Sequence, residues 1–189
     1  MNKRFDEAVA FATAAHSGQT RKMQNIPYIL HPMEVAAIAS TMTECEEILM
    51  AALLHDTVED CGVAMETITE KFGPRVAALV DSETEKRDES QTMEQSWKER
   101  KASSLEELRD ATDIGAKILW LSDKLANMRT FYNRWLKEGD EAFNLFHQKD
   151  KTEQRWYYQT VADYVPELAE TTAYAEYTAI IRKIFDGEE

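Results

Sequence analysis

The length, composition and charge of the chain exclude several classes of protein. It has 189 residues, 43% hydrophobic and 30% charged, with a net charge of −13, as expected for one globular domain. An acidic surface repels nucleic acid, so we expect no nucleic-acid partner. No apolar run is long enough to span a membrane, and the first residues do not resemble a signal peptide. The chain has only two cysteines, Cys45 and Cys61, which favours a cytoplasmic location.

The elements predicted along the chain are helices. Apolar spacing predicts seven of them over the approximate ranges 5–16, 33–42, 44–58, 66–72, 74–80, 93–109 and 114–136. Two more are expected in the C-terminal part. Gly18 suits the end of the first helix, and Pro32 suits the start of the second. Thr43 and Glu46 have the spacing of a capping box, in which each side chain caps the other's backbone. Pro166 is expected to open the last helix.

One segment, 81–92, is polar and lacks apolar periodicity. We interpret it as a mobile loop within the domain rather than a linker between domains. The chain shows no internal repeat and no convincing alternating strand. The sequence therefore predicts an all-α fold, with residues 1–189 forming a single compact bundle of about eight to ten helices.

The first group of chemically active residues lies in the segment LLHDTVED. On a helix, residues four apart share a face, so His55 lies over Glu59 and Asp56 lies over Asp60. These ionisable groups directly follow the apolar run 48–54. Burying them without a partner is costly, and a divalent cation is the simplest partner. The alternative is a solvated helix end with ordinary surface charges.

Two further segments supply candidate ligands. His31 precedes Pro32 at an expected helix start, where a lone histidine is more often a cap or a satisfied polar group. Asp123, Asn127 and Thr130 occur at i, i+4 and i+7 and form a polar stripe on a strongly apolar helix. Such a stripe is normally a solvated face, but the flanking apolar side chains favour an inward-facing aspartate.

Together these segments offer two imidazoles and two carboxylates: His31, His55, Asp56 and Asp123. Mixed nitrogen and oxygen ligands suit Mn²⁺, Fe²⁺, Co²⁺ or Zn²⁺ better than Ca²⁺. Four protein ligands on a six-coordinate ion leave positions for water and a phosphate oxygen. The set therefore indicates a metal-dependent phosphohydrolase.

At those four positions the pattern resembles the HD phosphohydrolase superfamily. Several segments resemble the hydrolase domain of the RelA/SpoT alarmone enzymes, and the chain is most similar to the free-standing small alarmone hydrolases. These segments are AHSGQTRK (15–22), PYILHPMEVA (27–36), AALLHDTVED (51–60), FGPRVAALV (72–80) and GAKILWLSDKLANMRT (115–130). The resemblance covers about residues 4–135, and we expect residues 136–189 to form C-terminal helices that complete the fold.

The resemblance implies an HD-domain fold, a Mn²⁺ cofactor and a nucleotide substrate. The implied reaction is hydrolysis of guanosine 3′,5′-bis(diphosphate) and the pentaphosphate at the 3′-diphosphate, giving GDP or GTP and pyrophosphate. The metal ligands would be the two histidines and two aspartates named above. The resemblance also assigns the attacking water to Glu59 and Asp60, and substrate contacts to Arg21, Lys22, Asn127 and Thr130.

Departures from the family pattern leave alternatives open. Family members commonly carry Ala where Ser122 stands and a larger residue, often His or Tyr, where Ala126 stands. The segment DSETEKR after Val80 also departs. Another nucleotide or dinucleotide phosphate therefore remains an alternative substrate. A non-catalytic nucleotide sensor is a third hypothesis, which the complete ligand set disfavours.

Some neighbouring residues have two interpretations. Lys124 and Arg129 are cations close to Asp123 in sequence that suit a phosphate substrate. They lie off the polar stripe, however, so they equally suit surface positions. We interpret His16 as structural and the aromatic cluster 156–158 as core.

Overall fold

The computed structural model describes residues 3–21, 25–84, 92 and 96–187 and is helical almost throughout. Its α-helices are α1 (Lys3–Ala15), α2 (Leu30–Ala39), α3 (Glu46–Cys61), α4 (Met65–Phe72), α5 (Pro74–Asp81), α6 (Trp97–Asp110), α7 (Ile114–Glu138), α8 (Lys151–Tyr164) and α9 (Thr172–Ile181). Short helical segments follow at η1 (Gly139–Leu145), η2 (Pro166–Leu168) and η3 (Arg182–Asp186). Across these described ranges, the only strand-like pairing is a single bridge between Thr20 and Pro27. The predicted all-α fold is confirmed.

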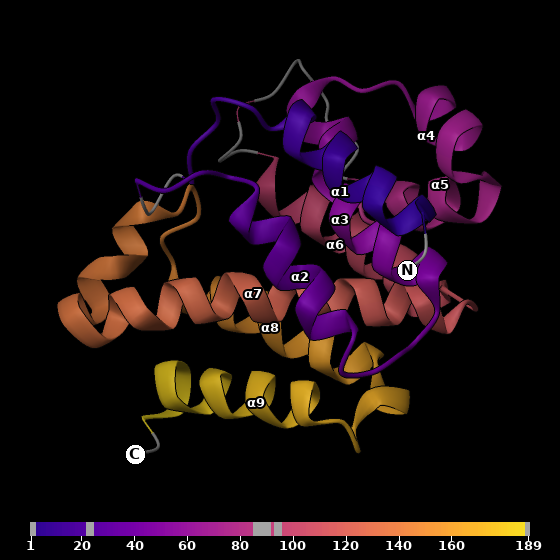
Figure 1. Ribbon diagram of the computed structural model, residues 1–189. Helices are drawn as coiled ribbons and strands as arrows, with labels where there is room; N and C mark the ends of the chain where they lie inside the picture. The colour runs from indigo at the N-terminus through magenta and orange to yellow at the C-terminus, as the bar shows by residue number, and fades with distance from the viewer. Residues whose placement is uncertain (1–2, 22–24, 85–91, 93–95, 188–189) are drawn as a thin grey trace.

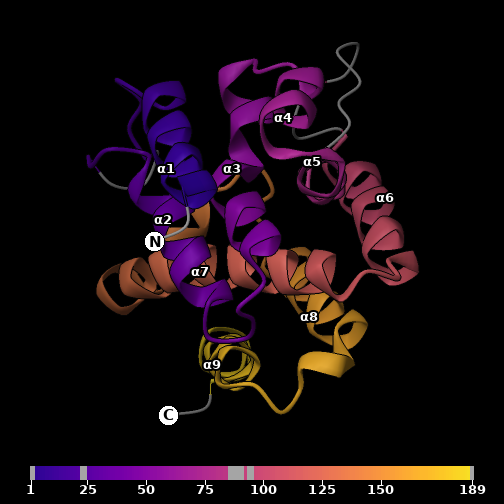
Figure 2. The same ribbon diagram turned by 45° about the vertical axis from the view of Figure 1, so that its right-hand side comes forward.

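The long helix α7 is the centre of the molecule. It packs against α2, α3, α8 and α9, with α1, α3, α4 and α5 on one side and α8 and α9 on the other (Figures 1 and 2). Every residue from 115 to 123 is buried. Because consecutive residues point in all directions around a helix, this part of α7 has no solvated face. Asp123, which begins the polar stripe, is therefore buried, whereas Asn127 and Thr130 are half-buried.

Helix α3 brings the HD pair into the core. Its residues from Met50 to His55 are all buried, and it packs against α1, α2, α5 and α7. The helix ends at Gly62, whose φ of 66° is in the left-handed region that favours glycine. Helix α2 packs against both α3 and α7. These three helices position the site.

Two predicted helix starts differ from the structure. Helix α2 begins at Leu30, so Pro32 lies inside the first turn, where its missing N–H loses no hydrogen bond. The predicted capping box is wrong. Cys45 is the N-cap of α3 and makes no side-chain cap bond, whereas the Thr43 hydroxyl accepts a hydrogen bond from the Cys45 backbone N–H. Thr43 therefore shapes the turn before the helix.

The C-terminal helices also differ in one boundary. Pro166 opens only the short segment η2, and the last α-helix begins at Thr172. The hydroxyl of Thr171 accepts a hydrogen bond from the Tyr174 backbone N–H and supplies the cap.

The predicted loop 81–92 lies only partly within the described residues. Helix α5 extends to Asp81, Ser82 to Thr84 form the turn that follows, and 85–91 lie outside the described part. Within the described residues, no helix has the length and apolar character needed to cross a bilayer.

Candidate active site

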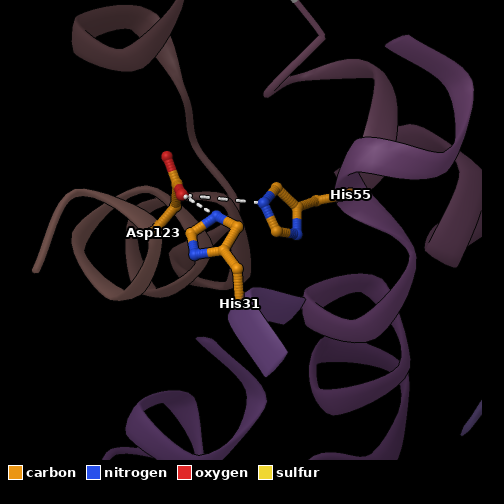
Figure 3. A group of neighbouring side chains, drawn as sticks. All are labelled: His31, His55 and Asp123. Atoms are coloured by element: carbon orange, nitrogen blue, oxygen red, sulfur yellow. Dashed lines mark ion pairs between the residues drawn. The ribbon is translucent and has the colours of Figure 1, made fainter. Parts of the chain in front are cut away.

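Three helices direct a histidine or an aspartate to one buried point (Figure 3). His31 comes from the first turn of α2, His55 from α3 and Asp123 from α7, and all three are buried. One ligand atom from each lies within 4.8 Å of the others. His31 Nε2 is 2.9 Å and His55 Nε2 is 3.6 Å from Asp123 Oδ1. The three segments that carry these residues are distant in sequence, and they meet in the structure as the sequence predicted.

Asp56 lies beside this group. Its Oδ2 atom is 3.1 Å from His55 Nε2 and 3.5 Å from His31 Nε2. The Tyr28 hydroxyl donates a hydrogen bond to the same oxygen at 2.8 Å. The four residues predicted as metal ligands are thus neighbours, while their service as ligands stays a prediction.

The electrostatics of His55 test whether these residues suit a cation. His55 Nδ1 lies 2.9 Å from the Ala52 carbonyl oxygen, which fixes the proton of the neutral ring on Nδ1. His55 Nε2 is then a buried lone pair without a hydrogen bond, facing the carboxylates of Asp56 and Asp123. Lone pairs and carboxylates repel each other unless a positive charge lies between them. Since imidazole and carboxylate are ligands of transition-metal ions, the residues fit a divalent cation.

The pKa values of His55 and Asp56 reflect the opposing effects of burial and of neighbouring charges. Burial lowers the pKa of His55, but the carboxylates of Asp56 and Asp123 outweigh burial and hold that pKa well above its ordinary value. Burial raises the pKa of Asp56, but the imidazoles of His55 and His31 lower it overall. A metal-free site therefore favours an imidazolium, and a bound cation would displace that proton.

Asp123 is held on both carboxylate oxygens. Asn127 Nδ2 donates to Oδ1 at 2.8 Å, and Lys124 Nζ donates to Oδ2 at 2.6 Å. Lys124 Nζ also donates to Glu83 Oε1 at 2.6 Å. Burial raises the pKa of Asp123, but Lys124 and His31 draw it well below its ordinary value. Burial also raises the pKa of Glu83, to about 7, against the opposing charge of Lys124.

Lys124 and Arg129, which the sequence left as either site or surface cations, have different surroundings in the structure. The side chain of Lys124 is 12% exposed, so the surface interpretation is wrong for it. Arg129 instead pairs with Glu176 and Glu34, away from the ligand group. Sequence spacing did not separate these two cations, because Glu83, Glu34 and Glu176 reach them from segments outside α7.

Two adjoining cavities open beside the ligand group. The first is about 220 Å³ and is lined by Arg21, Tyr28, His31, Asp56, Glu59, Asp60, Glu83, Lys101, Ser104, Trp120, Asp123, Lys124, Asn127 and Tyr157. The second is about 260 Å³ and is lined by Arg21, Tyr28, Asp60, Asn127, Thr130, Phe146 and Tyr158. The shared lining residues make them neighbouring parts of one site.

The predicted substrate contacts line these cavities, with one exception. Arg21 Nη2 donates to Asn127 Oδ1 at 2.9 Å, and its guanidinium lies 5.4 Å from the centre of the Tyr28 ring. Thr130 lines the second cavity. Lys22 lies outside the described residues. The structure therefore gathers the other three, while their binding role stays a prediction.

Several lining residues were missed by sequence reasoning or assigned elsewhere. Tyr28 and Phe146 carried no motif signal, although Tyr28 lies in a segment that resembles the family. Tyr157 and Tyr158 are buried, as predicted for core residues, but each also lines a cavity. His16 is buried against the ring of Tyr28, at 4.9 Å between ring centres, which supports its structural interpretation.

The two departures on α7 do not face the cavities. Ser122 and Ala126 are fully buried, and the Ser122 hydroxyl donates to the Ile118 carbonyl oxygen one turn back. Neither residue is among those that line the two cavities. An influence on substrate choice at these positions would therefore act through packing of α7.

Comparison with known proteins decides the family. The sequence profile of the HD domain matches residues 8–154. The chain belongs to the HD domain family. The predicted resemblance is confirmed.

Curated relatives and solved structures point the same way. The human guanosine-3′,5′-bis(diphosphate) 3′-pyrophosphohydrolase MESH1 is 38% identical over 136 residues, covering 70% of this chain and 72% of that protein. A Vibrio cholerae protein of the same enzyme name is 39% identical over 129 residues, covering 66% of this chain and 17% of that protein. The chain thus spans about a sixth of the length of such bacterial relatives.

The structural matches extend over nearly the whole chain. A metazoan ortholog of SpoT, described as hydrolysing ppGpp, has a TM-score of 0.75 at 29% identity, covering 97% of this chain and 96% of that one. The protein lmo0812 from Listeria monocytogenes has a TM-score of 0.71 at 31% identity, covering 82% of this chain and 99% of that one. The fold therefore continues beyond the region of strongest sequence similarity.

Proposed function

We propose that this protein is a metal-dependent 3′-pyrophosphohydrolase of guanosine tetra- and pentaphosphate. The observation that carries the proposal is the convergence of His31, His55 and Asp123, whose ligand atoms lie within 4.8 Å of one another at a buried point beside Asp56. The name of the human relative, of which the chain covers 72%, supports the substrate. The proposal includes a small-molecule nucleotide as the partner, no nucleic acid or membrane, and a cytoplasmic location.

The cation that we propose is Mn²⁺, with Fe²⁺, Co²⁺ or Zn²⁺ as alternatives. The residues that would hold it are His31, His55, Asp56 and Asp123. When bound, such an ion offsets negative charge on phosphoryl oxygens and makes water more acidic. The protein's own contribution is to fix the ligands: Ala52 orients His55, and Tyr28 holds Asp56.

Glu59 and Asp60 are proposed to take part in the proton transfers of the reaction. Hydrolysis replaces the bond between the 3′ oxygen and phosphorus with a bond from water oxygen. The attacking water must lose a proton, and the departing 3′ oxygen must gain one. Both acids line the first cavity beside the ligand group, so a carboxylate is available to accept the water proton.

The two cavities suit the two ends of a nucleotide. The first is lined by His31, Asp56 and Asp123 and by Lys101, which suits the diphosphate. The second adds Phe146, Tyr158 and Thr130, which suit a nucleoside through aromatic and polar contacts. We propose that Arg21, Lys22, Asn127 and Thr130 bind the substrate across this boundary.

The direct test combines a substrate assay with a ligand variant. Purified protein with Mn²⁺ and guanosine tetraphosphate should release pyrophosphate and GDP, and Asp56→Ala should abolish the release. Glu34→Gln is a matched control, because Glu34 also pairs with a cation but lies with Arg129 outside the two cavities. Absence of turnover with Mn²⁺, Fe²⁺, Co²⁺ and Zn²⁺ would refute the assigned substrate. A panel of other nucleotide and dinucleotide phosphates then identifies an alternative substrate, and tight binding without turnover identifies a sensor.

A further inference from the structure

Glu83 is a buried acid that the sequence motif does not include. It lies in the turn after α5, and its side chain is 7% exposed. Its Oε1 atom accepts a hydrogen bond from Lys124 Nζ at 2.6 Å. Lys124 Nζ in turn donates to Asp123 Oδ2 at 2.6 Å. A buried chain of alternating charges thus leads from Glu83 to a proposed metal ligand.

The geometry separates the two oxygens of Asp123 by role. Oδ2 accepts from Lys124, whereas Oδ1 lies 2.9 Å from His31 Nε2 and 3.6 Å from His55 Nε2. An ammonium that holds Oδ2 fixes the rotation of the carboxylate and directs Oδ1 at the imidazoles. Partners of this kind orient metal ligands and affect metal affinity.

The ammonium of Lys124 also has an unfavourable effect on metal binding. A positive charge beside Asp123 competes with a divalent cation for the same carboxylate, and burial strengthens that competition because few solvent dipoles screen it. Lys124 Nζ also lies 4.7 Å from the centre of the Trp120 ring. Within the described residues, the two anions that accept hydrogen bonds from Lys124 Nζ are Glu83 and Asp123. Glu83 therefore shares the charge that would otherwise rest on Asp123 alone.

We propose that Glu83 is a positioning residue of the metal centre, which holds Lys124 against Asp123 Oδ2 and balances the lysine charge so that Asp123 retains its affinity for the cation. This inference rests on the proposed metal centre.

The test measures metal binding without substrate. Metal-free protein is titrated with Mn²⁺ at about pH 8, where Glu83 is ionised because its pKa is about 7. Glu83→Gln keeps the shape but removes the balancing charge, so its affinity for Mn²⁺ should fall by about 10-fold. Glu34→Gln, which changes the same residue type beside Arg129, should bind Mn²⁺ like the parent.

A second variant tests whether Glu83 acts through Lys124. In Glu83→Gln with Lys124→Met the unbalanced ammonium is gone, so Mn²⁺ affinity should recover above that of Glu83→Gln alone. If Glu83→Gln is too unstable for titration, the readout is the Mn²⁺ concentration needed for a given rise in melting temperature. That concentration should be about 10-fold higher for Glu83→Gln than for the parent.

The outcomes separate this inference from the proposed function. Equal Mn²⁺ affinity in Glu83→Gln and the parent would overturn the positioning role while leaving the metal centre intact. A lower KM with unchanged metal affinity would also overturn it, because Lys124 would then serve the substrate. Failure of the double variant to recover affinity would overturn the charge-balancing role of Glu83. A parent protein that binds no divalent metal would instead refute the proposed function.

Discussion

At the scale of single residues, Asp123 and the Asn127 amide that donates to its Oδ1 atom are expected to make different contributions to metal binding. Asp123→Asn removes a ligand charge from a buried site, whereas Asn127→Ala removes only a donor 2.8 Å from Oδ1. We expect Asn127→Ala to weaken Mn²⁺ binding by about 10-fold and Asp123→Asn to weaken it further. Titration calorimetry on the metal-free proteins measures both. Equal affinities in the two variants would mean that Asp123 is not a ligand.

Arg21 gives a second prediction at this scale. Its guanidinium donates to Asn127 and lies against the ring of Tyr28, at the boundary of the two cavities. It therefore suits ground-state binding of the nucleotide. Arg21→Ala should raise KM more than it lowers kcat, which steady-state kinetics with guanosine tetraphosphate measures. A fall in kcat with unchanged KM would instead assign Arg21 to the transition state.

The residues of the site were predictable to different degrees. His55 and Asp56 are adjacent in a short motif, and His31 and Asp123 lie in segments with their own local pattern, so the sequence predicted that all four would converge. Glu83 had no such signal. It is linked to Asp123 through Lys124, and it lies in the turn after α5 whereas Lys124 lies on α7. Contacts of this kind depend on how helices pack, which local spacing does not specify.

At the scale of the element, the start of α7 depends on Asp113. Its carboxylate accepts a hydrogen bond from the Gly115 backbone N–H at 2.7 Å and pairs with Arg75. Asp113→Ala should lower the free energy of unfolding by about 1 kcal/mol, the usual cost of a lost N-cap. The Arg75 pair is largely exposed and adds little. Asp113→Asn retains a capping oxygen and should lose less, as denaturant unfolding would measure.

The same cap predicts a pH dependence. The hydrogen bond from Arg75, followed by that from Gly115, lowers the pKa of Asp113 below 3.8 in the folded protein. A lowered pKa contributes stability above the unfolded value, and that stability is lost as pH falls through the folded value. The stability difference between the parent and Asp113→Asn should therefore shrink below about pH 4. A difference that grows on acidification would contradict this assignment.

Gly115 provides another prediction for α7. A Cβ atom there would lie 2.9 Å from Ile48 Cγ1 and 3.0 Å from Ile48 Cδ1, so α7 approaches α3 closely at this point. Alanine normally favours a helix over glycine by about 1 kcal/mol. The collision with a buried isoleucine should reverse that preference and destabilise Gly115→Ala by about 1–3 kcal/mol. A melting temperature equal to or above that of the parent would show that Ile48 moves aside at little cost.

The elements themselves were largely predictable because apolar spacing determines which face of a helix is buried. Boundaries were less predictable where capping is unusual. Cys45 caps α3 without a side-chain bond, so no capping residue marks that start. Thr171 does mark the start of α9, but Pro166 gave the stronger local signal and opens only a short turn. Local signals identify candidate ends, and packing selects among them.

At the scale of the whole molecule, the ligand group joins helices α2, α3 and α7 at one buried point. A ligand that binds only the folded state stabilises it by mass action. The parent protein should therefore melt at a higher temperature with Mn²⁺ than with a chelator. At a free Mn²⁺ concentration about 100 times Kd the gain is about 2.7 kcal/mol. For a domain of this size that corresponds to a rise of about 5–10 °C.

The matched variants give this prediction its specificity. His55→Ala removes one imidazole and should abolish most of the Mn²⁺-dependent rise, because the remaining ligands no longer enclose the ion. Glu34→Gln should retain the full rise, since Glu34 contacts Arg129 and not the ligand group. Differential scanning calorimetry over a series of Mn²⁺ concentrations separates the two variants. An equal rise in His55→Ala would place the cation elsewhere on the acidic surface, because nonspecific binding to carboxylates does not require α2, α3 and α7 to meet.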